Sequence, residues 1–265
     1  MTRLNHLPLE LSQRLQDKSL LKIISGLSNF DKNSIKQVAS ASKLGGVDLL
    51  DIACKPELVE LAIQTSGLPV CVSSVEPDLF PAAVEAGAVV VEIGNFDSFY
   101  PVGRFFEAKE VLDLATETRS LLPDTPLSVT VPHILSLDKQ AQLALDLVDI
   151  GVDIVQTEGG TTANPFSPGS LGLIEKAAPT LAAVHAISEA FLNNNCAIPI
   201  LCASGLSAVT VPMAISIGAS GVGVGSAVNR LSDEVSMLAA IRSLREALPL
   251  SDKLISRTNT LRLER

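Results

Sequence analysis

Two stretches near the end of the chain, Pro199-Ile-Leu-Cys-Ala-Ser-Gly205 and Gly221-Val-Gly-Val-Gly-Ser226, decide the fold. Each is a short apolar run that ends in glycine and serine and leads into a helical segment, which is typical of a buried parallel strand. Glycine allows a tight turn and lets backbone N–H groups approach an anion, and a helix that begins there presents further unpaired N–H groups. The turns predict a phosphate site made by Ser204, Gly205, Gly225 and Ser226. Tight turns without a ligand are the alternative.

In an eight-stranded β/α barrel, a phosphate commonly binds after strands seven and eight. The sequence before residue 199 supplies the six earlier strands, at residues 21–24, 48–53, 69–73, 89–93, 127–131 and 153–156, each followed by a segment of helical periodicity. Strands that alternate with helices indicate a parallel sheet. A doubly wound open sheet is the rival, but no G-x-G-x-x-G follows the first strand and the even spacing favours closure.

We therefore predict an α/β protein with one (β/α)8 barrel domain over residues 1–265. A capping helix at about 8–18 precedes the barrel at about 20–248, and a polar tail covers about 251–265. Glycines that end helices, such as Gly46 and Gly151, return the chain directly to the next strand. Two loops on the opposite side are longer, at residues 94–104 and 157–170, and are candidate lids over the site.

The composition excludes several classes of partner. The net charge is -9 and no cluster of Lys and Arg occurs, which argues against nucleic acid. No apolar run approaches the roughly 20 residues of a membrane span, and the N-terminus lacks a signal-peptide core. The four cysteines form no C-x-x-C pair and no set of His and Cys has metal-ligand spacing, so we expect reduced thiols, a soluble interior protein and no metal site.

Polar residues occupy alternate positions of the predicted strands. Side chains of a barrel strand alternate between the interior and the helix layer, so Glu92 faces inward if its apolar neighbours face outward. The same rule places six residues inside: Lys22, Asp51, Ser73, Glu92, Thr130 and Gln156. Buried charges are costly unless paired, so Lys22 should pair with Asp51 or Glu92. Burial beside unlike charges also tunes groups for catalysis, and a structural salt-bridge plug is the alternative.

Three further polar residues, Asn95, His133 and Glu158, follow predicted strands and should line the mouth of the barrel. His133 is a candidate general acid or phosphate contact, with an ordinary surface histidine as the alternative. Glu158 precedes Gly159-Gly160 and is a candidate base or a capping residue.

Ordered motifs over about residues 21–244 carry a family resemblance: Lys22-Ile-Ile-Ser-Gly26, Asp51-Ile-Ala53, Glu92-Ile-Gly-Asn-Phe-Asp-Ser-Phe-Tyr100, Thr130-Val-Pro-His133, Gln156-Thr-Glu-Gly-Gly160, Cys202-Ala-Ser-Gly-Leu-Ser207 and Gly221-Val-Gly-Val-Gly-Ser-Ala-Val-Asn229. With these the chain resembles the conserved hypothetical chloroplast reading frame twenty-three family of cyanobacteria and red-lineage plastids. The resemblance implies an aldolase-type TIM barrel in a cyanobacterial cytosol or a plastid stroma, and it brings no established reaction.

More distantly, the last two motifs are similar to those of ribulose-phosphate-binding barrels, thiazole synthase-type proteins and some barrels that bind flavin mononucleotide (FMN). Those proteins bind a phosphate monoester at this position. Where class I aldolases often carry a Schiff-base lysine on strand six, this chain has Gln156. Schiff-base chemistry would have to use Lys22 instead.

The leading hypothesis is a lyase or isomerase that acts on a small phosphorylated metabolite. Lys22 would be a Schiff-base former or electrostatic stabiliser, Asp51 or Glu92 the base, and His133 or Glu158 a second proton donor. The residues expected to line the substrate are Ser73, Asn95, Thr130 and Gln156. One alternative is an FMN-binding oxidoreductase. Another is a non-catalytic metabolite sensor that binds a partner through the aromatic-rich segment 96–106.

Overall fold

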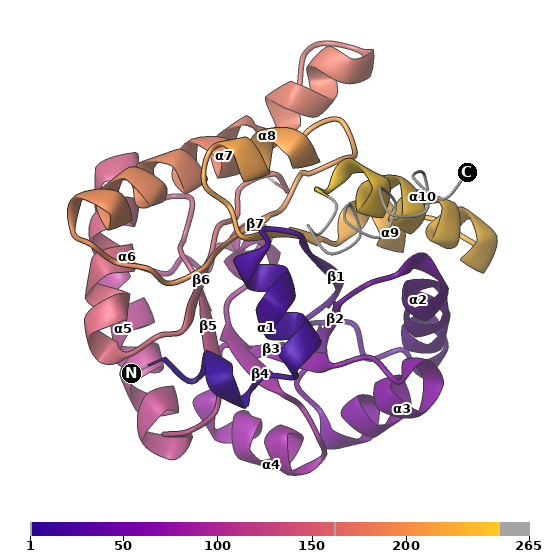
Figure 1. The fold of residues 1–265 in the computed structure, drawn as a ribbon, viewed down its shortest axis with the longest axis horizontal. Helices are drawn as coiled ribbons and strands as arrows, with labels where there is room; N and C mark the ends of the chain where they lie inside the picture. Colours follow the sequence, from indigo (N-terminus) through magenta and orange to yellow (C-terminus); the bar gives the residue numbers. More distant parts are fainter. Residues whose placement is uncertain (1, 162, 250–265) are drawn as a thin grey trace, which may run out of the picture.

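Eight parallel strands form a closed barrel surrounded by helices in the computed structural model, which describes residues 2–161 and 163–249 (Figure 1). The strands follow one another around the barrel in chain order, and the last pairs with the first. They are β1 (Leu20–Gly26), β2 (Leu49–Ala53), β3 (Val70–Ser74), β4 (Val90–Ile93), β5 (Leu127–Thr130), β6 (Ile154–Gln156), β7 (Ile200–Ala203) and β8 (Gly221–Val224). The predicted barrel is confirmed.

The helices cover the outside of the barrel in the order that the sequence predicts. They are α2 (Lys32–Gly45), α3 (Pro56–Ser66), α4 (Phe80–Glu85), α5 (Ala108–Leu121), α6 (Leu137–Ile150), α7 (Gly169–Asn193), α8 (Val211–Ser216), the short α9 (Ser226–Asn229) and α10 (Glu234–Ala247). Helices α2 and α6 end at Gly46 (φ 78°) and Gly151 (φ 89°), in the left-handed conformation that glycine adopts at little cost. The predicted tail at 251–265 lies outside the described residues.

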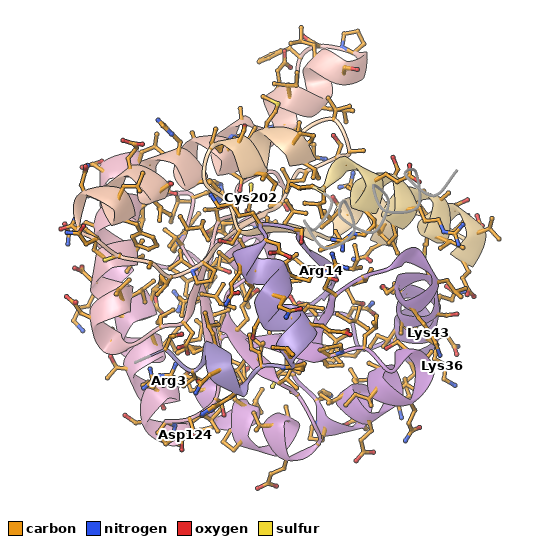
Figure 2. The ribbon with its side chains drawn as sticks, viewed as in Figure 1. Arg3, Arg14, Lys36, Lys43, Asp124 and Cys202 are labelled. Atoms are coloured by element: carbon orange, nitrogen blue, oxygen red, sulfur yellow. The ribbon has the colours of Figure 1, made fainter. Side chains whose placement is uncertain are left out.

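Helix α1 (Leu9–Gln16) closes the N-terminal end of the barrel, where it crosses the opening that faces the viewer in Figure 1. Leu11 and Leu15 on this helix join an apolar cluster with the lowest inward-facing residues of the strands: Leu20, Leu49, Cys71, Val90, Ile154 and Leu201. Arg14 of this helix, labelled in Figure 2, pairs with Asp48 at 3.2 Å. The interior of the barrel is therefore filled by apolar side chains at this end, and the polar inward-facing residues lie further along the strands.

The loop after β4 contains two short 3-10 turns, η3 (Phe96–Ser98) and η4 (Tyr100–Val102). Its aromatic side chains pack inward. Phe96 and Phe106 are buried with ring centroids 4.4 Å apart, and Tyr100 is also buried. Only Phe105 of this aromatic group is largely exposed. The sequence predicted that the aromatic side chains of residues 96–106 form an exposed contact surface. This prediction is wrong for most of them, because they pack on the inner side of the lid.

Candidate functional site

The six polar residues that strand parity placed inside the barrel lie together in one hydrogen-bonded layer. Lys22 Nζ donates to Glu92 Oε2 at 2.6 Å and to Gln156 Oε1 at 3.1 Å, and it lies 3.3 Å from Asp51 Oδ2. Ser73 donates to Asp51 at 2.7 Å. Gln156 Nε2 donates to Glu92 Oε1 at 2.7 Å and to Thr130 Oγ1 at 3.3 Å. Each of these side chains therefore has a hydrogen-bond or ion-pair partner within the layer, which is closed to solvent.

Burial and charge act in opposite directions within this layer. Burial disfavours the ammonium of Lys22, but Asp51 and Glu92 outweigh it and raise the pKa of Lys22 above its usual value. Burial raises the pKa of Asp51 to about 6, although Lys22 opposes that change. Lys22 is consequently a charged group fixed between two carboxyl groups. Its inward orientation agrees with the alternation that the sequence indicated.

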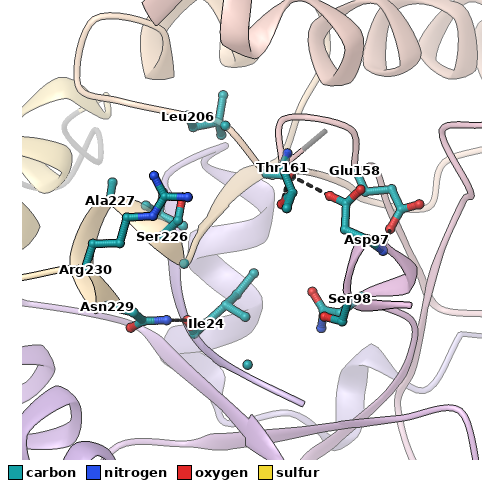
Figure 3. Close-up of a pocket in the computed structure, with 16 residues that line it drawn as sticks. Ile24, Asp97, Ser98, Glu158, Thr161, Leu206, Ser226, Ala227, Asn229 and Arg230 are labelled. Atoms are coloured by element: carbon teal, nitrogen blue, oxygen red, sulfur yellow. Dashed lines mark hydrogen bonds between the residues drawn. The ribbon is translucent and has the colours of Figure 1, made fainter. Parts of the chain in front are cut away.

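A cavity of about 290 Å³ opens at the C-terminal end of the barrel, above this layer (Figure 3). Its floor includes Ile24, the next inward residue after Lys22 on β1. The cavity is lined by Asn95, Glu158 and all four residues of the predicted phosphate site. Lys22, Asp51 and Glu92 are not among its described lining residues.

Two consecutive residues of the first phosphate-site turn have positive φ angles. Ser204 (φ 73°) and Gly205 (φ 75°) are both left-handed. Gly205 lies against the backbone of Gly160, and a Cβ at Gly160 would meet Gly205 Cα at 2.2 Å. On the facing wall, Gly225 precedes α9. The N–H groups of Val228 and Asn229 donate to Gly225 O at 2.9 and 3.0 Å, whereas those of Ser226 and Ala227 have no acceptor within the helix. Among the described residues, the N–H groups of Gly205, Leu206, Ser226 and Ala227 have no hydrogen-bond acceptor.

Arg230 supplies the positive charge that the sequence analysis did not assign to this site. It lines the cavity, and in Figure 3 its guanidinium lies beside Ser226. The spacing of four residues between Ser226 and Arg230 places both on one face of a helical turn. That spacing was the sequence signal that could have assigned Arg230 to the site. Asn229 has a different task, since its amide donates to Ile24 O at 2.6 Å and ties α9 to β1.

His133 and Glu158 contact each other beside the cavity, and the structure adds Asp97 to them. Asp97 and Glu158 line the cavity, whereas His133 is not among its described lining residues. His133 Nδ1 lies 3.3 Å from Asp97 Oδ1 and 3.3 Å from Glu158 Oε1. Tyr100 OH donates to Glu158 Oε1 at 2.6 Å, and the N–H of Asp97 donates to Glu158 Oε2 at 3.1 Å. Ser204 Oγ donates to Asp97 Oδ2 at 2.9 Å and so connects this cluster to the phosphate-site turn. We refer to Asp97, His133 and Glu158 as the acidic cluster.

The pKa values of two groups in the acidic cluster, and of Tyr100 beside it, are shifted from their usual values. Burial raises the pKa of the Glu158 carboxyl above its usual value, against the effect of His133 and Tyr100. Burial disfavours the imidazolium of His133, but Glu158 and Asp97 outweigh it and raise the pKa of His133. Burial, followed by the charge of Glu158, raises the pKa of Tyr100. Asp97 and Tyr100 could not be assigned from the sequence because they lie in irregular turns, where no periodicity indicates which way a side chain points.

Among the described residues, no helix is long and apolar enough to cross a membrane.

A sequence profile described as "Protein of unknown function (DUF561)" matches residues 5–254. The chain is 40% identical over 232 residues to the uncharacterized protein ycf23 of Pyropia yezoensis, covering 88% of this chain and 83% of that protein. It is 42% identical over 231 residues to ycf23 of Cyanophora paradoxa, covering 87% of this chain and 93% of that protein.

Solved structures with a similar fold share little sequence with the chain. Thiamine phosphate pyrophosphorylase from Pyrococcus furiosus is 17% identical with a TM-score of 0.55, covering 88% of this chain and 96% of that one. The (S)-3-O-geranylgeranylglyceryl phosphate synthase from Thermoplasma acidophilum, in complex with its substrate sn-glycerol-1-phosphate, is 12% identical with a TM-score of 0.58, covering 91% of this chain and 99% of that one. At these identities the likeness concerns the fold alone, a TIM barrel.

Proposed function

We propose that this chain, which belongs to the DUF561 family of proteins of unknown function, binds a small phosphorylated metabolite in the cavity at the C-terminal end of its barrel. The observation that carries the proposal is the convergence on one cavity of two glycine-serine turns and the side chain of Arg230. Backbone N–H groups without acceptors and a guanidinium are the donors that phosphate oxygens require. The phosphate-bearing substrate named with the Thermoplasma barrel is consistent with such a ligand.

The chemistry that we propose is that of a lyase or isomerase, with the reacting part of the ligand directed toward the barrel axis. Of the two roles predicted for Lys22, the geometry favours electrostatic stabiliser over Schiff-base former. A Schiff base forms from a neutral amine that the substrate can reach, whereas Lys22 is buried, charged and not among the described lining residues of the cavity. Asp51 and Glu92 remain its counter-charges. We place this activity in a cyanobacterial cytosol or a plastid stroma.

The cavity favours a small metabolite over the two alternatives. Its volume of about 290 Å³ is at the small end for ligand pockets, and its described lining includes no aromatic side chain against which a flavin ring would stack. A sensor that binds a partner through the lid is less favoured, because most of the lid aromatics are buried.

Native mass spectrometry of freshly purified protein tests the proposal first. We expect a bound species with the mass of a small phosphorylated compound, whereas a mass equal to that of FMN would support the oxidoreductase alternative. The second measurement is a calorimetric titration of the protein with inorganic phosphate in the presence of EDTA. We expect Arg230→Met to weaken phosphate binding about tenfold to a hundredfold, since a charge-assisted hydrogen bond contributes about 1.5–3 kcal/mol and about 1.4 kcal/mol is a factor of ten.

Arg242→Met is the matched control, because Arg242 is an exposed arginine on α10 outside the cavity lining. It should bind phosphate as the unmodified chain does. Equal affinities for the Arg230 and Arg242 variants, or no phosphate binding by the unmodified chain, would contradict the proposed site.

A further inference from the structure

The acidic cluster contains more negative charge than a site for a phosphate ester would tolerate alone. Asp97 and Glu158 both line the cavity, and Asp97 is hydrogen-bonded to the serine of the phosphate-site turn. Arg230 is the one cationic side chain in the described lining of the cavity. If a phosphate dianion binds there, the two neighbouring carboxylates would repel it unless they are neutralised, either by protonated His133 between them or by a bound cation.

The spacing of the cluster atoms fits a bound cation. One atom from each of the three side chains lies within 4.8 Å of the others, and the two contacts of His133 Nδ1 with carboxylate oxygens are both 3.3 Å. Two ligands about 2.1 Å from one ion, at angles of about 90–110°, are about 3.0–3.4 Å apart. One of these contacts, between His133 Nδ1 and Glu158 Oε1, is a hydrogen bond in the structure. Both contacts also match the separation of neighbouring ligands on one metal ion.

One carboxylate oxygen of the cluster, Asp97 Oδ1, has an ion-pair contact with His133 Nδ1 but no hydrogen-bond partner among the described residues. Asp97 is buried, with an exposed fraction of 7%. Its other oxygen, Oδ2, is held by Ser204 Oγ at 2.9 Å and by the N–H of Gly159 at 3.4 Å. These bonds turn Oδ1 toward His133 and Glu158.

Glu158 is oriented in a similar way. Tyr100 OH and the N–H of Asp97 bind its two oxygens and fix the plane of the carboxylate. Hydrogen bonds of this kind, made to metal ligands by the residues around them, set ligand orientation in known metal sites. The arrangement brings three possible ligand atoms together beside the cavity that Asp97 and Glu158 line.

We infer that Asp97, His133 and Glu158 bind a divalent metal ion next to the phosphate site. One imidazole and two carboxylates suit Mn²⁺ and related ions, since carboxylates favour Mg²⁺ and Mn²⁺ and imidazole favours Zn²⁺ and Fe²⁺. The ion neutralises both carboxylates and presents its open positions to the cavity. His133 and Glu158 are then metal ligands rather than the proton donors predicted from the sequence. The charge argument rests on the proposed phosphate binding, whereas the geometric argument does not.

Titration with Mn²⁺ alone tests the inference. The full chain is treated with EDTA, desalted and titrated with MnCl₂ while the electron paramagnetic resonance signal of free Mn²⁺ is recorded, with Mg²⁺ and Zn²⁺ as competitors. We expect one Mn²⁺ per chain. Asp97→Asn and Glu158→Gln should each weaken binding at least about tenfold, since even changes around the ligands cost about 10–100-fold.

Glu76→Gln is the matched control, because Glu76 is an exposed carboxylate after β3 that lies outside the described lining of the cavity. It should leave Mn²⁺ binding unchanged. For variants that fail to fold, crystals of the unmodified chain soaked in MnCl₂ give a second measurement. An anomalous peak about 2 Å from the three ligand atoms supports the inference.

The inference would be overturned if none of the three ions, Mn²⁺, Mg²⁺ and Zn²⁺, bound stoichiometrically. The cluster would then be a protonated histidine held by two carboxylates. Binding that is equal in the Asp97, Glu158 and Glu76 variants would overturn it as well. Because the titration contains no phosphate, its result is independent of the proposed function. Mn²⁺ binding together with no phosphate binding would reject only the latter.

Discussion

At the scale of single residues, Lys22 is the group whose loss should cost the most. It is fully buried and holds Glu92 at 2.6 Å and Asp51 at 3.3 Å. We expect Lys22→Met to lower the free energy of unfolding by about 3–5 kcal/mol, because removing one partner leaves uncompensated charge in the interior. Denaturant unfolding followed by circular dichroism measures the loss.

Lys109→Met is the control for this prediction. Lys109 pairs with Asp113 at 2.6 Å, but both side chains are exposed, so the change should be under about 1 kcal/mol. A double variant, Lys22→Met with Glu92→Gln, should lose less stability than the two single variants added together, because each loss leaves the same partner unpaired. Similar losses for the Lys22 and Lys109 variants would show that the buried layer contributes little to stability.

At the scale of elements, Glu158 at the end of β6 links the lid after β4 to the barrel by hydrogen bonds. Its carboxylate accepts from Tyr100 OH at 2.6 Å and from the N–H of Asp97 at 3.1 Å, both on the lid. We expect Tyr100→Phe to increase the amide exchange of residues 96–103 about tenfold or more. A hydrogen bond to a charged group contributes about 1.5–3 kcal/mol, and about 1.4 kcal/mol is a factor of ten.

Hydrogen exchange with mass spectrometry measures this effect, with the amides of β3 as the internal reference. The removed hydroxyl is far in sequence from β3 and makes no bond to it, so exchange there should stay as it is in the unmodified chain. If lid protection is unchanged in Tyr100→Phe, the aromatic packing of Phe96 and Phe106, and not the bond to Glu158, holds the lid closed.

At the scale of the whole molecule, the regular parts of the barrel could be predicted and the irregular parts could not. The alternation of strands and helices gave the closure, and strand parity gave the interior layer around Lys22, because both are periodic. Asp97 and Tyr100 lie in 3-10 turns after Asn95, whose φ of 61° redirects the chain in a way that no sequence period indicates. The depth of Lys22 below Ile24 also depends on the register of the strands around it.

The whole barrel has a packed end and a site end, and this division leads to a last prediction. Leu11 on α1 is 2% exposed within the apolar cluster that seals the N-terminal opening, whereas Leu9 on the same helix is 73% exposed. Leu11→Ala should lower the free energy of unfolding by about 2–5 kcal/mol through lost burial and the cavity left behind. Leu9→Ala should change it by less than about 1 kcal/mol, as surface substitutions usually do. Because α1 lies at the end opposite the cavity, Leu11→Ala should keep phosphate and Mn²⁺ affinities below its unfolding transition, as measured by calorimetry. Weakened binding in a folded Leu11→Ala protein would mean that the two ends of the barrel are coupled through the buried layer.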